Sequence, residues 1–206
     1  MHAANWPSRV IPTDLDILDV ENWRVAYFEL APDLSQILAQ TESADRKEPR
    51  VLLWAPADDQ RLELGQLFVV SGVAFSPDGT LVAASSITGI TKVWDARTGQ
   101  EIAKLTGFMN SSLAVAFSPD GKRLVVGGGG DGLCRLWDVE TWRELITLRI
   151  DGQSFSTMRF SPDGNVLGAK IDSVANTGAY GYWQCWRAPS WEEIAMAEAK
   201  ERFETK

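Results

Sequence analysis

Histidine and cysteine are scarce in this 206-residue chain, which has one histidine, His2, and two cysteines, Cys134 and Cys185. Two cysteines are too few for a disulfide framework or a four-ligand zinc site. A single histidine near the N-terminus cannot supply the base of a serine triad or the usual metal ligands. The sequence therefore predicts no catalytic residue, no metal site and no cofactor. Both cysteines are interpreted as small apolar core residues.

Long hydrophobic runs and excess positive charge are also absent. The longest apolar stretches are about five residues, whereas a helix that spans a bilayer needs roughly 20. The N-terminus lacks the basic cluster and apolar core of a secretory signal. Twenty basic and 28 acidic side chains give a net charge of -8, which repels phosphate backbones and anionic lipids. We expect a cytoplasmic protein whose partners are neither nucleic acid nor membrane.

The sequence contains an internal repeat of 42 or 43 residues. Ser-Pro-Asp-Gly occurs at 76–79, at 118–121 and at 161–164, in steps of 42 and 43 residues. A second marker, Trp94-Asp95, returns 43 residues later as Trp137-Asp138. Because both markers keep one period, the repeat predicts one structural unit that recurs along the chain.

Each marker has a physical interpretation. Proline and aspartate suit the corners of a type I turn and glycine accepts positive φ, so Ser-Pro-Asp-Gly predicts a tight β-hairpin. Short β-rich runs such as Leu81-Val82-Ala83 flank these turns. The strand that ends in Trp94-Asp95 is the third of each unit, and the more polar Glu101-Ile102-Ala103-Lys104-Leu105 is the fourth. Four short strands in about 43 residues are typical of one β-propeller blade.

These residues resemble WD40 repeats, and the string from Trp186 to Ile194 resembles the C-terminal ends of bacterial WD40 proteins. The resemblance implies an all-β fold, a WD40-like propeller array, and a role in protein interaction. Upstream, Ala31-Pro32-Asp33 matches the turn, but Leu34 replaces its glycine, so we expect that hairpin to turn differently. Downstream, Trp186 lies 49 residues after Trp137. We place the extra residues in the loop 172–180.

The sequence thus predicts about four four-stranded blades, which span roughly 23–67, 68–107, 108–151 and 152–190. WD40 propellers usually close with more blades, and an unclosed array exposes an apolar face at each end. We therefore expect either that two chains pair as a homodimer that completes an eight-bladed ring, or that the chain belongs to a longer propeller.

The two ends of the chain flank the blades. Residues 1–22 contain a possible edge strand, Asp14–Val20, in which aspartates are spaced among apolar residues. At the other end Ser190 and Glu193 fit a capping box, and the helix formers after them predict a short helical tail over 191–206. The alternative is an outer strand, by register with Arg143–Leu148.

Two motifs that suggest chemistry have simpler explanations. The run Gly127–Gly132 matches a dinucleotide-binding pattern, but the residues after it predict a strand where that motif needs a helix. It is interpreted as a strand end and a turn. The resemblance implies that Asp131 belongs to a hydrogen-bond network inside the blade. Phe108 follows Gly107 where the family has histidine, so we expect this network to be incomplete.

Aspartates and tryptophans suggest calcium or sugar sites. Asp14, Asp16 and Asp19 lack the glycine and distal glutamate of an EF-hand, so solvated carboxylates are the preferred interpretation. Four of the nine tryptophans fall on the repeat period and are predicted to be core residues: Trp54, Trp94, Trp137 and Trp186. Four others lie off that register: Trp23, Trp142, Trp183 and Trp191.

The resemblance implies that loops on one face of the array receive partners. The large residues that we assign to these loops are Phe108, Met109, Asn110, Phe155 and Tyr180. They either anchor a partner or fold inward to fill the central channel. We predict a non-catalytic protein-interaction or scaffolding module. The alternatives are a propeller enzyme with a metal or acid-base site in its channel, and a non-autonomous part of a larger propeller protein.

Overall fold

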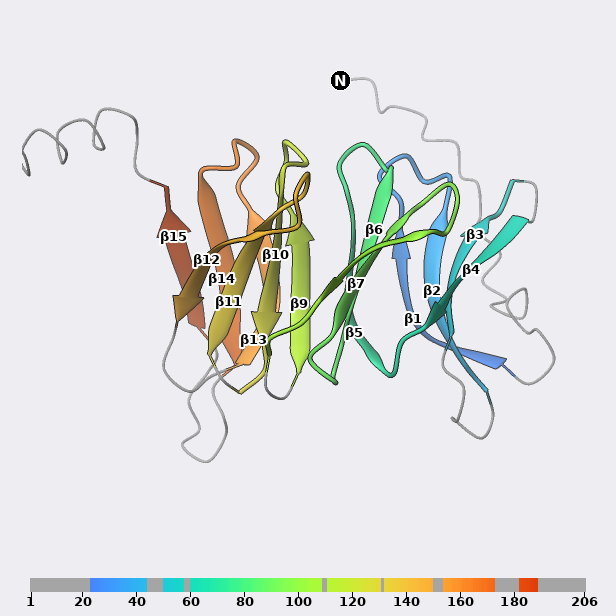
Figure 1. Cartoon of the computed structure of the whole chain (residues 1–206), viewed down its shortest axis with the longest axis horizontal. Helices are drawn as coiled ribbons and strands as arrows, with labels where there is room; N and C mark the ends of the chain where they lie inside the picture. The colour runs from blue at the N-terminus through green and yellow to red at the C-terminus, as the bar shows by residue number, and fades with distance from the viewer. Residues whose placement is uncertain are drawn as a thin grey trace, which may run out of the picture.

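Antiparallel strands make up the regular structure of the described residues. The computed structural model describes residues 23–43, 50–57, 60–108, 111–130, 132–149, 154–172 and 182–188. Within these ranges fifteen strands form four sheets, which lie side by side in chain order (Figure 1). The predicted edge strand in 14–20 and the predicted helical tail over 191–206 lie outside the described residues.

Each sheet is one blade whose strands follow one another in sequence. Blade 1 contains β1 (Trp23–Leu30), β2 (Ile37–Ser43), β3 (Arg50–Ala55) and β4 (Gln60–Gln66). Blade 2 contains β5 (Val70–Phe75), β6 (Leu81–Ser86), β7 (Thr91–Asp95) and β8 (Glu101–Leu105). Blade 3 contains β9 (Ser112–Phe117), β10 (Arg123–Gly128), β11 (Leu133–Asp138) and β12 (Glu144–Arg149). Blade 4 contains β13 (Ser154–Phe160), β14 (Val166–Asp172) and β15 (Tyr182–Arg187). The predicted all-β array of four blades is confirmed, with three strands of blade 4 in the described part.

The Ser-Pro-Asp-Gly motif forms the turn between the first two strands of a blade. In blade 2 the amide of Gly79 donates to the carbonyl of Ser76 at 2.9 Å, and Gly79 has φ +71°. The Ser76 hydroxyl donates to Asp78 Oδ1 at 2.6 Å. This bond, with further bonds from Thr80, holds the pKa of Asp78 below its usual value. The predicted hairpins are confirmed, and their glycines carry the positive φ.

The corresponding turn of blade 1 corrects one expectation. Leu34 adopts φ +62°, and its amide donates to the carbonyl of Ala31 at 2.9 Å, as Gly79 does to Ser76. The hairpin therefore turns in the same way, although leucine replaces glycine. Asp33 Oδ1 accepts bonds from the Ser35 amide and hydroxyl at 2.9 and 2.7 Å. The flanking strands and these bonds fix the turn, and the leucine backbone takes the strain.

Replacing Leu34 with glycine is expected to stabilise the chain by about 1 kcal/mol, because positive φ costs a non-glycine residue roughly 1–2 kcal/mol. Leu34 is exposed, so the substitution loses little packing. Urea denaturation measures the difference. The matched control is Gly79→Leu, where a Cβ meets no atom within 4 Å and only the backbone strain is added. Leu34 is not a site of backbone strain if both variants are less stable than the wild type.

In the described part of the chain, the hydrophobic core is divided into three clusters between successive blades. Trp94 lies fully buried between blades 1 and 2, and Trp137 lies between blades 2 and 3. Trp186 packs, partly buried, against the cluster between blades 3 and 4. The core role predicted for the periodic tryptophans is confirmed for Trp94 and Trp137. Of the off-register residues, Trp142 packs against the second cluster and Trp183 is exposed.

Candidate partner-binding face

Two connections of blade 2 are joined at one end of the sheet: residues 67–69, which enter the blade, and the turn 87–90. Ser86 joins them, since its hydroxyl donates to the carbonyl of Phe68 and accepts from the Thr88 amide at 3.1 Å. The Ile87 amide donates to the carbonyl of Val69 at 3.2 Å. Because Ser86 is fully buried, these bonds hold both loops on a rigid base.

Two large apolar side chains project from this base. Phe68 is 54% exposed and Ile87 is 40% exposed. Exposed apolar side chains on a fixed backbone lose little entropy on binding, and such residues are typical anchors of protein interfaces. We call this pair the blade-2 loop patch. The sequence did not predict this patch. Phe68 nevertheless lies, like Phe108, in a connection between two blades, so the search for large residues in these loops would have included it.

The structure places Phe108 inside the molecule. Its ring packs edge-on against Trp137, with centroids 6.1 Å apart, and it belongs to the cluster between blades 2 and 3. The Arg135 guanidinium lies 5.5 Å from the ring centroid, donates to the carbonyl of Gly107 at 3.0 Å and pairs with Glu144 at 2.7 Å. A hydrogen bond from Thr147 and the Arg135 charge hold the pKa of Glu144 below its usual value.

Phe155 is also buried, in the cluster between blades 3 and 4, where its ring lies 6.3 Å from that of Trp186. The structure therefore does not bring Phe108 and Phe155 together on one exposed surface. Met109, Asn110 and Tyr180 lie outside the described residues, and their role in partner binding stays a prediction. In the described part of the loops, Phe68 and Ile87 are exposed instead.

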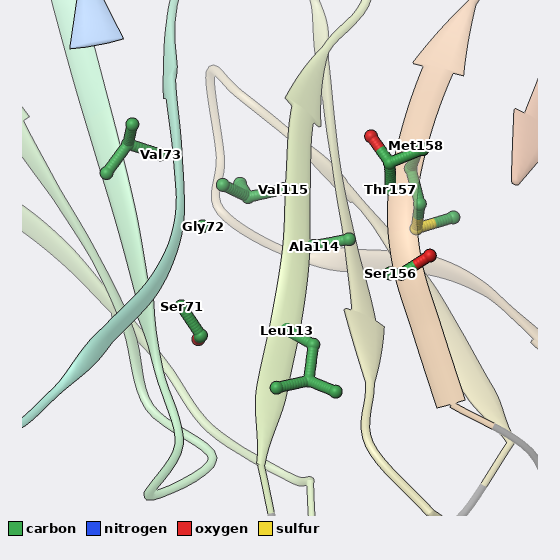
Figure 2. Close-up of a pocket in the computed structure, with 9 residues that line it drawn as sticks. All are labelled: Ser71, Gly72, Val73, Leu113, Ala114, Val115, Ser156, Thr157 and Met158. Atoms are coloured by element: carbon green, nitrogen blue, oxygen red, sulfur yellow. The ribbon is translucent and has the colours of Figure 1, made fainter. Parts of the chain in front are cut away.

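The innermost strands β5, β9 and β13 line an open hollow (Figure 2). Its lining residues carry hydroxyl, thioether or aliphatic groups, or no side chain: Ser71, Gly72, Val73, Leu113, Ala114, Val115, Ser156, Thr157 and Met158. The Ser71 hydroxyl donates to the carbonyl of Ser112 and ties β5 to β9. None of these nine residues has a side chain that acts as a general acid or base at neutral pH.

The other candidates for chemistry are structural in the described part of the chain. No group of three or more histidine, cysteine, aspartate or glutamate side chains there could hold a metal ion. Burial raises the pKa of the Cys134 thiol to about 12, so it is no nucleophile at neutral pH. Gly127 and Gly128 end β10 and Leu133 begins β11, so a strand follows the glycine run as predicted.

The incomplete network is visible in blade 2. Trp94 Nε1 is buried, and the described residues give it no hydrogen-bond partner. Asp131, the aspartate expected in the network of blade 3, lies outside the described residues. In that blade the ring of Phe108, which stands where the family has histidine, packs against Trp137 and the Arg135 guanidinium.

The sheets stack in chain order, and a tryptophan recurs at the same place in successive sheets. This arrangement defines a β-propeller type of protein. The family profile described as "WD domain, G-beta repeat" matches residues 64–95 and 99–138. The chain is 30% identical, over 122 residues, to the uncharacterized WD repeat-containing protein sll1491 of Synechocystis. This match covers 55% of this chain and 35% of that protein. Residues 64–138 of the chain thus contain WD40 repeats.

A solved structure shares the fold. The hydrazine synthase of Kuenenia stuttgartiensis superposes with a TM-score of 0.65 at 19% identity, over 82% of this chain and 46% of that chain. At this identity the likeness concerns the fold. The chain spans about a third of the length of its Synechocystis relative and about half of the hydrazine synthase chain.

Proposed function

We propose that this chain is a protein-interaction or scaffolding module of the cytoplasm, with no catalysis of its own. The observation that carries the proposal is the blade-2 loop patch, in which a buried serine fixes the backbone of two loops that carry exposed apolar side chains. Antiparallel sheets that pack on one another hold this base rigid, so a partner meets a preformed surface. The WD40 repeats support the same class of function.

The charge of the chain supports a protein partner. The net charge of -8 opposes contact with nucleic acid and with anionic lipid. The structure contains, within its described residues, no helix that is both long and apolar enough to span a membrane. The central hollow offers hydroxyl and apolar groups, which suit packing better than proton transfer.

The double substitution of Phe68 and Ile87 with serine is expected to weaken partner binding at least about tenfold, since truncating two anchors removes most of the apolar contact. The partner is first identified by pull-down from native cell extract, and its affinity is then measured by calorimetry. The fold is expected to remain intact, because both side chains are exposed.

The matched control is Ile102→Ser, since Ile102 is similarly exposed but lies on the outer strand β8. It is expected to bind the partner as the wild type does. Equal affinity in the double variant would show that the partner uses another surface. Equal loss in both variants would indicate a general effect of lost surface hydrophobicity.

A further inference from the structure

Blade 4 has one face without a neighbouring blade in the described structure. Leu167, Ala169 and Ile171 of β14 point into the cluster with blade 3, so the residues that alternate with them face the other way. A Cβ on Gly168 would lie 3.9 Å from both Cys185 Sγ and Trp183 Cε3, so these residues share that opposite side. We call it the blade-4 face; it consists of Arg159, Gly168, Lys170, Trp183, Cys185 and Arg187.

The same positions of blade 3 are covered by blade 4. The cross-strand pair Gly127 and Cys134 corresponds to Lys170 and Trp183, because the two sheets have the same register. Cys134 is 0% exposed, whereas Trp183 is 59% exposed. Ala116 corresponds to Arg159, which is exposed. Small neutral residues of a buried junction are thus replaced by cations and an indole.

These replacements oppose an ordinary blade junction on the blade-4 face. A Cβ on Gly127 would lie 2.7 Å from both Met158 Sδ and Phe155 Cβ, so the junction of blades 3 and 4 has no room for a side chain there. Blade 4 has Lys170 at this position. In a ring of two chains, blade 1 of the second copy would stack on the blade-4 face. Phe28 of that copy would then lie against Lys170, because Phe28 pairs with Ala39 in blade 1 as Met158 pairs with Ala169 in blade 4. The homodimeric ring would therefore press a phenylalanine against a lysine.

The blade-4 face instead has the chemistry of a site for acidic chains. Lys170 lies directly across from Trp183 in the sheet, and Arg159 pairs with Gly168 beside them. Carboxylates pair with such cations, and an apolar side chain packs on the exposed indole. In the described residues β15 is also an edge strand, and edge strands accept extended peptides through backbone hydrogen bonds.

We propose that the blade-4 face binds an acidic, extended segment of a partner protein, whose carboxylates contact Arg159 and Lys170 and whose apolar side chains pack on Trp183. This deepens the proposed function and rests on it, since it names a second contact for the same kind of partner. The chain's net negative charge acts at long range and is screened beyond about 10 Å at 0.1 M salt. The local cations therefore determine binding at this face.

The test uses the full chain and a short fluorescent peptide of the repeat Glu-Ser-Val-Ser, in which glutamate and valine share one face of the extended chain, at about 0.1 M salt. Anisotropy is expected to show binding at least about tenfold tighter than that of the same peptide with lysine in place of glutamate. The variant Arg159→Glu/Lys170→Glu is expected to lose this preference, and Trp183→Ala is expected to weaken binding of the acidic peptide.

The matched control, Arg97→Glu/Lys104→Glu, makes the same charge change at exposed positions of blade 2 and is expected to bind the acidic peptide as the wild type does. The proposal is overturned if this control loses as much affinity, or if both peptides bind equally. It is also overturned if light scattering shows a dimer that Lys170→Gly strengthens, since the face would then be a blade junction. Unchanged partner capture by the Phe68/Ile87 variant would count only against the blade-2 loop patch.

Discussion

Replacing Trp94 with alanine is expected to lower the free energy of unfolding by about 3–5 kcal/mol, the usual loss when a large aromatic side chain is removed from a core. Trp94 is fully buried in the cluster between blades 1 and 2. Its removal leaves a cavity that rigid sheets cannot close, so the transfer free energy and the packing are both lost. Urea denaturation followed by circular dichroism measures the difference.

Two controls separate packing from other effects. Trp54 occupies the same position in blade 1 and is only partly buried, so Trp54→Ala is expected to cost clearly less. Trp94→Phe is expected to cost less than Trp94→Ala, because the Trp94 Nε1 group has no hydrogen-bond partner to lose among the described residues. Equal losses at Trp94 and Trp54 would contradict the inter-blade position of the core.

The second large effect is expected at Phe108. Phe108→Ala should lower the free energy of unfolding by about 3–5 kcal/mol, because the ring is buried against Trp137 and the Arg135 guanidinium. Part of this loss comes from the contact between the ring and the Arg135 guanidinium. Thermal and urea unfolding of the same variant measure the effect.

The matched control is Phe68→Ala, which removes an equally large ring from an exposed site. It is expected to change the free energy of unfolding by no more than about 0.5 kcal/mol. If the Phe108→Ala protein is as stable as the wild type but no longer captures its partner, Phe108 is a partner-binding loop residue and not a core residue.

The repeat could be predicted from the sequence because two motifs, Ser-Pro-Asp-Gly and Trp-Asp, recur with the same period. Ser76–Gly79 and Trp94-Asp95 each specify a local geometry, and their common spacing determines the order of strands in a blade. The structure confirms both. Leu34 shows the limit of such residue preferences, since the expectation of a different turn was wrong. The pairing of β1 with β2 imposes the turn, and a preference worth about 1 kcal/mol cannot resist it.

Loop residues were harder to place than strands. Phe108 and Phe68 both belong to connections between blades, and sequence spacing does not show which ring turns inward. The direction depends on the neighbouring sheet. Phe108 packs on Trp137 and Arg135, whereas the carbonyl of Phe68 accepts a hydrogen bond from Ser86 and its side chain stays about half exposed. The blade-4 face was equally hidden, because it emerges only when paired positions of two sheets are compared.

The two thiols of the chain differ in what they can report. Cys134 is buried between blades 3 and 4, as predicted, whereas Cys185, which was wrongly predicted to be a core residue, is exposed on the other side of blade 4. An alkylating reagent therefore reaches Cys185 in the intact array and reaches Cys134 only after those two sheets separate. The ratio of the two labelling rates therefore measures how often blade 4 separates from blade 3, with Cys185 as the internal reference.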